Sequence, residues 1–95
     1  MKRVERIAYY EELLNRTEPV LADLAKALEQ YAEAREGLRK LEKYLGSAQW
    51  RKDFEADEAG ELPEDLPRGV LSEDGIYNLL EENRELLETM KELVK

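Results

Sequence analysis

The sequence predicts an all-α protein. A long N-terminal helix, kinked at Pro19, packs antiparallel on a C-terminal helix, with a short Trp-bearing helix and a Pro-containing connector between them. Two observations predict this class. Charged residues make up 40% of the 95 residues, and Ala, Glu, Lys, Leu and Arg are abundant, which is typical of long helices. Apolar residues also recur at spacings of three and four along most of the chain.

The first helix is expected over about residues 2–45, within a single domain that spans residues 1–95. Its apolar residues alternate three and four apart, as in helices that pack side by side. They are Val4, Ile7, Tyr10, Leu14, Leu21, Leu24, Leu28, Tyr31 and Leu38, with Thr17 and Arg35 as the two weak members of the row. Gly46 and Ser47 follow Leu45 and are expected to end the helix.

Pro19 allows two interpretations of this segment. Thr17 can cap a new helix after a short turn near residues 15–19, because the first turn of a helix tolerates proline. Alternatively, one helix continues through Pro19 with a kink. The apolar spacing is kept from Leu14 through Thr17 to Leu21, which a turn would preserve only by accident. The kinked helix is therefore favoured.

The lengths of the two long helices are unequal. At 1.5 Å per residue, some 43 helical residues span about 65 Å, whereas a final helix over about residues 72–94, with some 22 residues after its cap at Ser72, spans about 33 Å. One copy of the final helix cannot cover the whole apolar row, so a turn at Pro19, a second subunit or a partner must cover the rest. We expect self-association, for which Ile7, Tyr10, Leu14 and Leu21 are the candidates.

A short helix is expected over about residues 47–59. Ser47 is a suitable N-cap, and Gly60 is a suitable stop. Trp50 and Phe54 lie four apart and therefore on one face. A hydrophobic plug under the connector is the favoured interpretation of this pair, and an aromatic pair that binds a partner is the alternative.

The connector, residues 60–71, is expected to cross in an extended conformation, because Pro63 and Pro67 disfavour helix in the residues before them. The last helix is expected to start at Ser72 as its N-cap. Gly75 in its first turn suggests a close approach by another chain segment. Asn83 interrupts the apolar row of this helix; it is expected at the solvated edge, or buried where it would fix register.

Carboxylates crowd the start of the connector. They are Asp53, Glu55, Asp57, Glu58, Glu61, Glu64 and Asp65. Dense oxygen ligands suit Ca²⁺ or Mg²⁺, but counting from Asp53, the sixth position of a calcium loop needs Gly and is Glu58. A solvated acidic surface is therefore favoured over metal binding at Asp53, Glu55, Asp57, Glu61 and Glu64, and over docking on a basic partner.

Arg51 and Arg68 are cations within this acidic stretch. Because a guanidinium can hold a carboxylate through two hydrogen bonds, we expect these arginines to clip the connector to Asp53, Asp57 or Asp74. The alternative leaves them available to a partner. With Trp50, Asp53, Phe54 and Asp57, they form the candidate interaction residues.

Several kinds of chemistry are disfavoured. The chain has no His and no Cys, which removes the usual zinc ligands, the common general base and thiol nucleophiles. No glycine-rich phosphate loop is present. A net charge of −8 disfavours nucleic acid and anionic membranes, and no apolar run approaches a membrane span. We expect a cytoplasmic, non-enzymatic protein without a cofactor.

Residues 50–60, Trp-Arg-x-Asp-Phe-Glu-Ala-Asp-Glu-Ala-Gly, and residues 62–74, Leu-Pro-x-Asp-Leu-x-Arg-Gly-Val-Leu-Ser-Glu-Asp, resemble the signature of a small bacterial family of domains of unknown function. The resemblance covers essentially the whole chain. It implies a bacterial, cytoplasmic origin and a helical N-terminal half, and it carries over no catalytic or binding residue.

Three hypotheses follow for the function. The first is a non-enzymatic interaction module that self-associates through its helical row. The second is an acidic inhibitor, or antitoxin-like protein, that covers a basic surface on its partner; its binding would weaken steeply with salt. The third is a divalent-cation site at residues 53–65.

Overall fold

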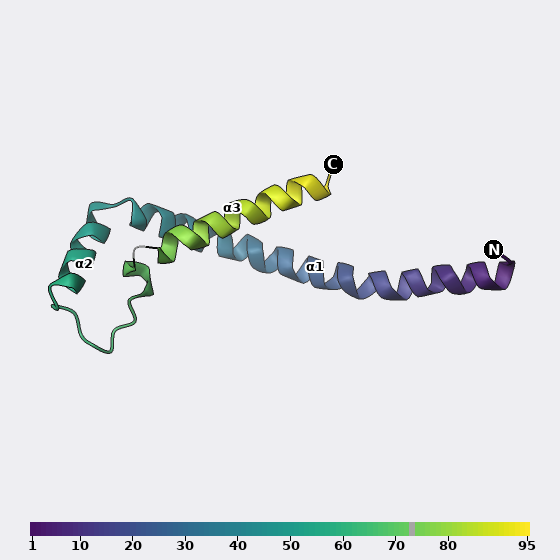
Figure 1. Ribbon diagram of the computed structural model, residues 1–95, viewed down its shortest axis with the longest axis horizontal. Coiled ribbons are helices and arrows are strands. Elements are labelled where there is room, and N and C mark those ends of the chain that lie inside the picture. The colour runs from purple at the N-terminus through teal and green to yellow at the C-terminus, as the bar shows by residue number, and fades with distance from the viewer. Residues whose placement is uncertain (73) are drawn as a thin grey trace. The chain divides into compact units, whose positions relative to one another are not determined.

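The computed structural model describes residues 1–72 and 74–95. Its elements are α1 (Arg3–Leu45), α2 (Ala48–Glu58), the 3₁₀ turn η1 (Gly69–Leu71) and α3 (Gly75–Leu93), as Figure 1 shows. Within these described residues there is no strand, so the predicted all-α class is confirmed. The chain divides into two compact units, Met1–Glu36 and Gly37–Lys95.

The first unit consists of α1 alone, which continues without a break through Pro19. The structure therefore contains the continuous helix and not the turn near residues 15–19; the kink stays a prediction. Proline removes one backbone hydrogen bond, but good helix formers surround it, and Arg16 pairs with Glu12 one turn earlier at 2.6 Å. Pro19 lies two positions, about 200°, from both Thr17 and Leu21, so it occupies the face opposite the apolar row.

The second unit opens with the end of α1 and the helix α2. Gly46 and Ser47 separate these two helices, as expected. The Ser47 side chain accepts a hydrogen bond from the Trp50 backbone N–H at 3.2 Å, which confirms the predicted N-cap. The Ser47 hydroxyl also donates to the Tyr44 carbonyl at 2.6 Å, so one side chain joins the end of α1 to the start of α2.

Helix α2 ends in the Schellman arrangement, with Gly60 at φ 71°. The Gly60 N–H donates to the Asp57 carbonyl at 3.1 Å, and the Glu61 N–H donates to the Ala56 carbonyl at 3.0 Å. A left-handed φ is what glycine supplies at this position without strain. Gly60 is therefore the stop signal of α2, as its place in the sequence indicates.

The buried apolar residues of the second unit are Leu71 and Ile76, 6% and 3% exposed. They flank the junction between η1 and α3, and both α2 and α3 contact η1. Leu41 of α1 lies across a hollow from Ile76 and Leu79 of α3. The core of this unit is therefore small and centred on the end of the connector.

Two predictions about this junction need correction. The connector is not extended throughout, because Gly69–Leu71 forms a 3₁₀ turn. Helix α3 begins at Gly75 and not at Ser72. Ser72 is extended, at ψ 146°, and its hydroxyl donates to the Gly69 carbonyl at 2.9 Å. Its oxygen still accepts the Gly75 N–H at 3.0 Å, so Ser72 satisfies a helix donor from outside the helix.

The close approach expected at Gly75 is present. A Cβ built on Gly75 would lie 2.4 Å from the Gly69 carbonyl oxygen and 2.6 Å from the Ser72 hydroxyl. The first of these atoms belongs to the backbone and cannot rotate away. The turn of η1 onto α3 therefore requires a residue without a side chain. Asn83, further along α3, is half-buried.

Candidate functional site

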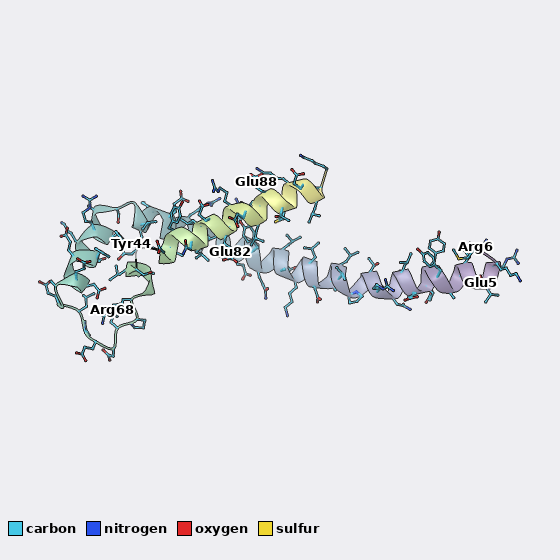
Figure 2. All side chains as sticks on the ribbon, in the orientation of Figure 1. Glu5, Arg6, Tyr44, Arg68, Glu82 and Glu88 are labelled. Atoms are coloured by element: carbon cyan, nitrogen blue, oxygen red, sulfur yellow. The ribbon has the colours of Figure 1, made fainter. Side chains whose placement is uncertain are left out.

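Arg68 holds the connector in a closed loop. Its Nη1 lies 2.5 Å from Asp57 Oδ1 on α2, with both side chains about one-third exposed or less. Its Nη2 donates to the Pro63 carbonyl at 2.6 Å, and its Nε donates to the Leu66 carbonyl at 3.2 Å. Figure 2 labels Arg68 at this position. One guanidinium thus satisfies two loop carbonyls and one helix carboxylate, which fits the expected clip to Asp57.

Arg51, the other arginine of the acidic stretch, is exposed. It forms no ion pair with any residue among 1–72 and 74–95. Arg51 lies on α2, whereas Arg68 lies at the start of η1. The expected clip therefore involves Arg68 and Asp57, and the described residues show no counterpart at Arg51.

Trp50 and Phe54 lie on one face of α2, as their spacing indicates. Their rings stack at 5.2 Å between centroids and 18° between planes. The Trp50 Nε1–H donates to the Val70 carbonyl in η1 at 2.9 Å, and both rings are half-buried. A Trp with a satisfied N–H and one stacked face is an anchor between α2 and the end of the connector. This arrangement supports the hydrophobic plug more than the partner-binding pair.

Asp53 points to the end of α1. The Tyr44 hydroxyl donates to Asp53 Oδ2 at 2.6 Å; Tyr44 is labelled in Figure 2. This hydrogen bond, together with desolvation and the negative charge of Asp53, raises the pKa of the Tyr44 phenol above its ordinary value of about 10. The pair ties α2 to the end of α1.

A shallow hollow lies between these ties. Its volume is about 260 Å³. Its lining residues are Tyr44, Asp53, Leu62, Leu66, Pro67, Arg68, Val70 and Leu71. The polar groups around it already have partners, since Tyr44 is bonded to Asp53 and Arg68 to Asp57. Of the described residues that line the hollow, those with polar side chains, Tyr44, Asp53 and Arg68, thus each already have a partner, and the rest of the lining is apolar.

The acidic candidates do not converge. Among the residues that the structure describes, no group of three or more carboxylates is placed to hold a metal ion. Asp53 and Asp57 are engaged with Tyr44 and Arg68, while Glu55, Glu61 and Glu64 are exposed. Within the described residues these carboxylates therefore do not gather around one point, and Glu55, Glu61 and Glu64 lie on an acidic surface.

The apolar row on α1 is the second candidate surface. Its members between residues 7 and 28 are exposed to between 44% and 60%: Ile7, Tyr10, Leu14, Leu21, Leu24 and Leu28. We name this set the stripe. Side chains project from α1 along the first unit in Figure 2, and no other element belongs to that unit. The four self-association candidates, Ile7, Tyr10, Leu14 and Leu21, thus lie on one exposed helix face.

Sequence reasoning missed four hydrogen-bond partners in and around the connector. Tyr44 had the required hydroxyl, but nothing in the spacing linked it to Asp53 nine residues later. The other three are the backbone carbonyls of Val70, Pro63 and Leu66. Every residue carries a backbone carbonyl, so the sequence does not indicate which carbonyl accepts a hydrogen bond from a given indole or guanidinium.

The fold and the connector define a small all-α domain built on one long helix and an Arg-clipped loop. The chain belongs to the family of domains of unknown function DUF4298, whose model matches residues 7–93. The expectation of a domain-of-unknown-function family is thereby confirmed, while bacterial origin stays a prediction. Neither a curated protein nor a solved structure matches the chain.

A helix that spans a membrane has to be both long and apolar. Across residues 1–72 and 74–95, none is both long and apolar enough to cross a bilayer.

Proposed function

We propose that this chain is a non-enzymatic interaction module that self-associates through the stripe on α1. The observation that supports this most strongly is the exposure of the stripe. Six large apolar side chains on one face of a helix remain about half exposed, and a contiguous apolar surface of this kind marks an interaction site. The heptad spacing adds that the expected occupant is another helix.

The second long helix is too short to remove this exposure. Helix α3 has 19 residues and α1 has 43, so α3 covers less than half of α1 in any placement. The first unit has no other element of its own. A second molecule is therefore needed to cover the stripe from end to end.

The free energy gained by burying the stripe is similar in size to the free-energy cost of association. Burying the exposed half of a large apolar side chain stabilises by about 1 kcal/mol, so six such residues in each of two copies contribute on the order of 10 kcal/mol. Association costs roughly 4–15 kcal/mol. Because these quantities are similar, we expect the association to depend on protein concentration within the range that experiments reach.

The connector supports the non-enzymatic part of the proposal. The two polar pairs at and beside the connector are Arg68 with Asp57 and Tyr44 with Asp53. In each pair the two side chains are bonded to each other and hold neighbouring segments together. The chain has no His or Cys to supply the commonest acid–base or nucleophilic chemistry. The stripe and the connector therefore both suit a protein partner better than a small-molecule substrate.

The experiment substitutes Leu14→Glu and Leu21→Glu together and measures mass by light scattering. Two buried carboxylates at the centre of a helical seam should dissociate the assembly. The matched control is Ala8→Glu with Ala22→Glu, which adds the same charge to exposed positions beside the stripe. We expect the first variant to be monomeric and the control to keep the wild-type mass; equal masses would overturn the proposed interface.

A second candidate function rests on the exposed carboxylates of the connector. Glu55, Glu58, Glu61, Glu64 and Asp65 are all exposed, which suits an acidic inhibitor or antitoxin-like protein that covers a basic surface. Binding to a polylysine surface would test it. Retention that falls steeply between 50 and 500 mM salt, on the order of tenfold or more, supports this candidate, and retention that is absent at low salt removes it.

A further inference from the structure

We infer that the end of the connector binds an amphipathic helix of another protein, one that carries Lys or Arg along one edge of its apolar face. The inference rests on the second candidate function, in which exposed carboxylates meet a basic partner, and it does not depend on self-association through the stripe. It adds the apolar contact that holds such a partner and the edge on which the partner's cations lie.

The apolar contact is formed by four exposed residues of the second unit. Leu66, Val70 and Leu79 are 45%, 40% and 43% exposed, and Pro67 is exposed between the first two. We name these four residues the patch. Large apolar side chains that lie together on a surface mark an interaction site, whereas the same residues scattered singly do not.

Two hollows bring the patch together. The hollow of about 260 Å³ described above is lined in part by Leu66, Pro67 and Val70. A second hollow, of about 320 Å³, is lined in part by Pro67, Val70 and Leu79, with Leu41 and Ile76. Because Pro67 and Val70 line both hollows, the hollows are neighbours with a common wall. Their volumes are near the lower limit of about 300 Å³ for small-molecule pockets, so each suits a partner's side chain better than a free ligand.

Two neighbouring hollows favour a helix as the occupant. An amphipathic helix presents apolar side chains three or four residues apart on one face, and it can insert one of them into each hollow. An extended segment usually binds by adding a strand to the edge of a sheet. The part of the chain that the structure describes has no strand and therefore offers no such edge.

The connector gives the patch an acidic edge. Glu64 and Asp65 directly precede Leu66, and Glu61 precedes Leu62, which lines the first hollow. All three carboxylates are exposed, and none forms an ion pair with a residue among 1–72 and 74–95. Arg68 does not neutralise them, because its guanidinium is bonded to Asp57 and to two loop carbonyls.

Acids elsewhere in the second unit are neutralised within the chain. On α3, three glutamates each pair with a cation three residues later, as Glu81–Arg84, Glu88–Lys91 and Glu92–Lys95. The connector lacks such cations, since residues 53–65 contain seven carboxylates and no Lys or Arg. Complementary charge on a partner is therefore most effective at the connector.

The end of α1 limits where the partner's cations can lie. Lys40 and Lys43 are next to Leu41 and Tyr44, which line the two hollows. A partner that is basic on all sides would meet like charge there. We therefore expect cations along the partner edge that faces the connector, and neutral or acidic residues along the opposite edge.

The test uses a synthetic helical peptide of about 18 residues, long enough to be helical in isolation. Its leucines are spaced three and four apart, its lysines lie along one edge of the leucine face, and its other residues are glutamine. The control peptide has glutamate in place of lysine. Amide chemical shifts of the isotope-labelled protein, recorded by nuclear magnetic resonance, show where each peptide binds and how tightly.

We expect the lysine peptide to shift amides within residues 62–80 and the glutamate peptide to leave them unchanged. Leu66→Ser with Val70→Ser should abolish this binding. Glu64→Gln with Asp65→Asn should weaken it about three- to tenfold, the effect of two ion pairs at an exposed rim. The matched control, Glu29→Gln with Glu33→Gln, removes the same charge from exposed positions of the first unit and should bind as the wild type does.

Three results would overturn the inference. Shifts confined to residues 7–28 would place the peptide on the stripe, and equal affinity for the two peptides would show that charge does not select the partner. No shift with either peptide would remove the patch as a docking site. If the protein is nevertheless retained on polylysine at low salt, the second candidate function survives without the patch; if it is not, that function fails as well.

Discussion

Arg68 and Asp57 form an ion pair across the connector, 2.5 Å between Nη1 and Oδ1. The two residues are eleven apart in sequence, and between them lie the stop of α2 and both prolines of the connector. Because the same guanidinium also holds the Pro63 and Leu66 carbonyls, the loop is closed on itself before it reaches the small core at Leu71. The loop geometry should therefore depend on this one side chain.

Replacing Arg68 with Ala should lower the thermal midpoint. The substitution leaves Asp57 without its partner and frees two carbonyls; with partial solvent screening the cost is about 1–2 kcal/mol, or several degrees for a domain of this size. Thermal unfolding followed by circular dichroism measures it. Arg51→Ala is the matched control and should leave the midpoint within about 1–2 degrees. Equal midpoints for the two variants would show that Arg68 does not hold the loop.

Replacing Trp50 with Phe should also destabilise the protein. The ring can still stack on Phe54, but the hydrogen bond to the Val70 carbonyl is lost, at a cost of about 1 kcal/mol plus some lost packing. Denaturant unfolding measures the change. Phe54→Leu serves for comparison, since it keeps the Trp50 hydrogen bond and removes the stack. If Trp50→Phe is as stable as wild type, the indole N–H does not anchor α2 to η1.

Tyr44 should ionise at higher pH than an exposed tyrosine. Its pKa is raised because it donates to Asp53. A raised pKa in the folded state means that this contribution to stability is fully present below pH 10, the ordinary value, and is lost as pH rises through the folded pKa. Ultraviolet absorbance of the wild type and of Tyr44→Phe isolates the Tyr44 transition. Asp53→Asn should bring that transition back toward pH 10; an unmoved transition would contradict the assignment.

Glycine-to-alanine substitution should have opposite effects at two positions. Alanine usually stabilises a helix relative to glycine by about 1 kcal/mol. Gly37 has open space where a Cβ would lie, so Gly37→Ala should raise the free energy of unfolding by roughly this amount. At Gly75 the Cβ would meet the Gly69 carbonyl at 2.4 Å, so Gly75→Ala should lower it. A stabilised Gly75→Ala variant would mean that η1 does not turn closely onto α3.

The helices were predictable because their signals are local. Ser47, Gly60 and the three-and-four spacing act through neighbours in the sequence, and α1 continues through Pro19 because its spacing was kept. The start of α3 was misplaced at Ser72 because the hydroxyl that suits an N-cap is shared with the Gly69 carbonyl of η1. The sequence does not determine which of several acids Arg68 holds, because that choice depends on how the loop folds back.

The candidate surfaces were predictable to different degrees. The stripe follows from periodicity, and its exposure follows from the unequal lengths of α1 and α3. The acidic candidates were not separable by sequence. Asp53 accepts a hydrogen bond from Tyr44 and Asp57 pairs with Arg68, whereas Glu55 and Glu61 are exposed on other parts of the surface. Their roles depend on which face of α2 meets the connector, and residue type does not encode that.

Self-association through the stripe is the central claim, and light-scattering mass across a hundredfold range of concentration tests it most directly. The wild-type protein should rise from monomer toward dimer as concentration increases, and Leu14→Glu with Leu21→Glu should remain monomeric throughout. A wild-type mass that stays monomeric over the whole range would contradict the claim and assign the stripe to a different partner.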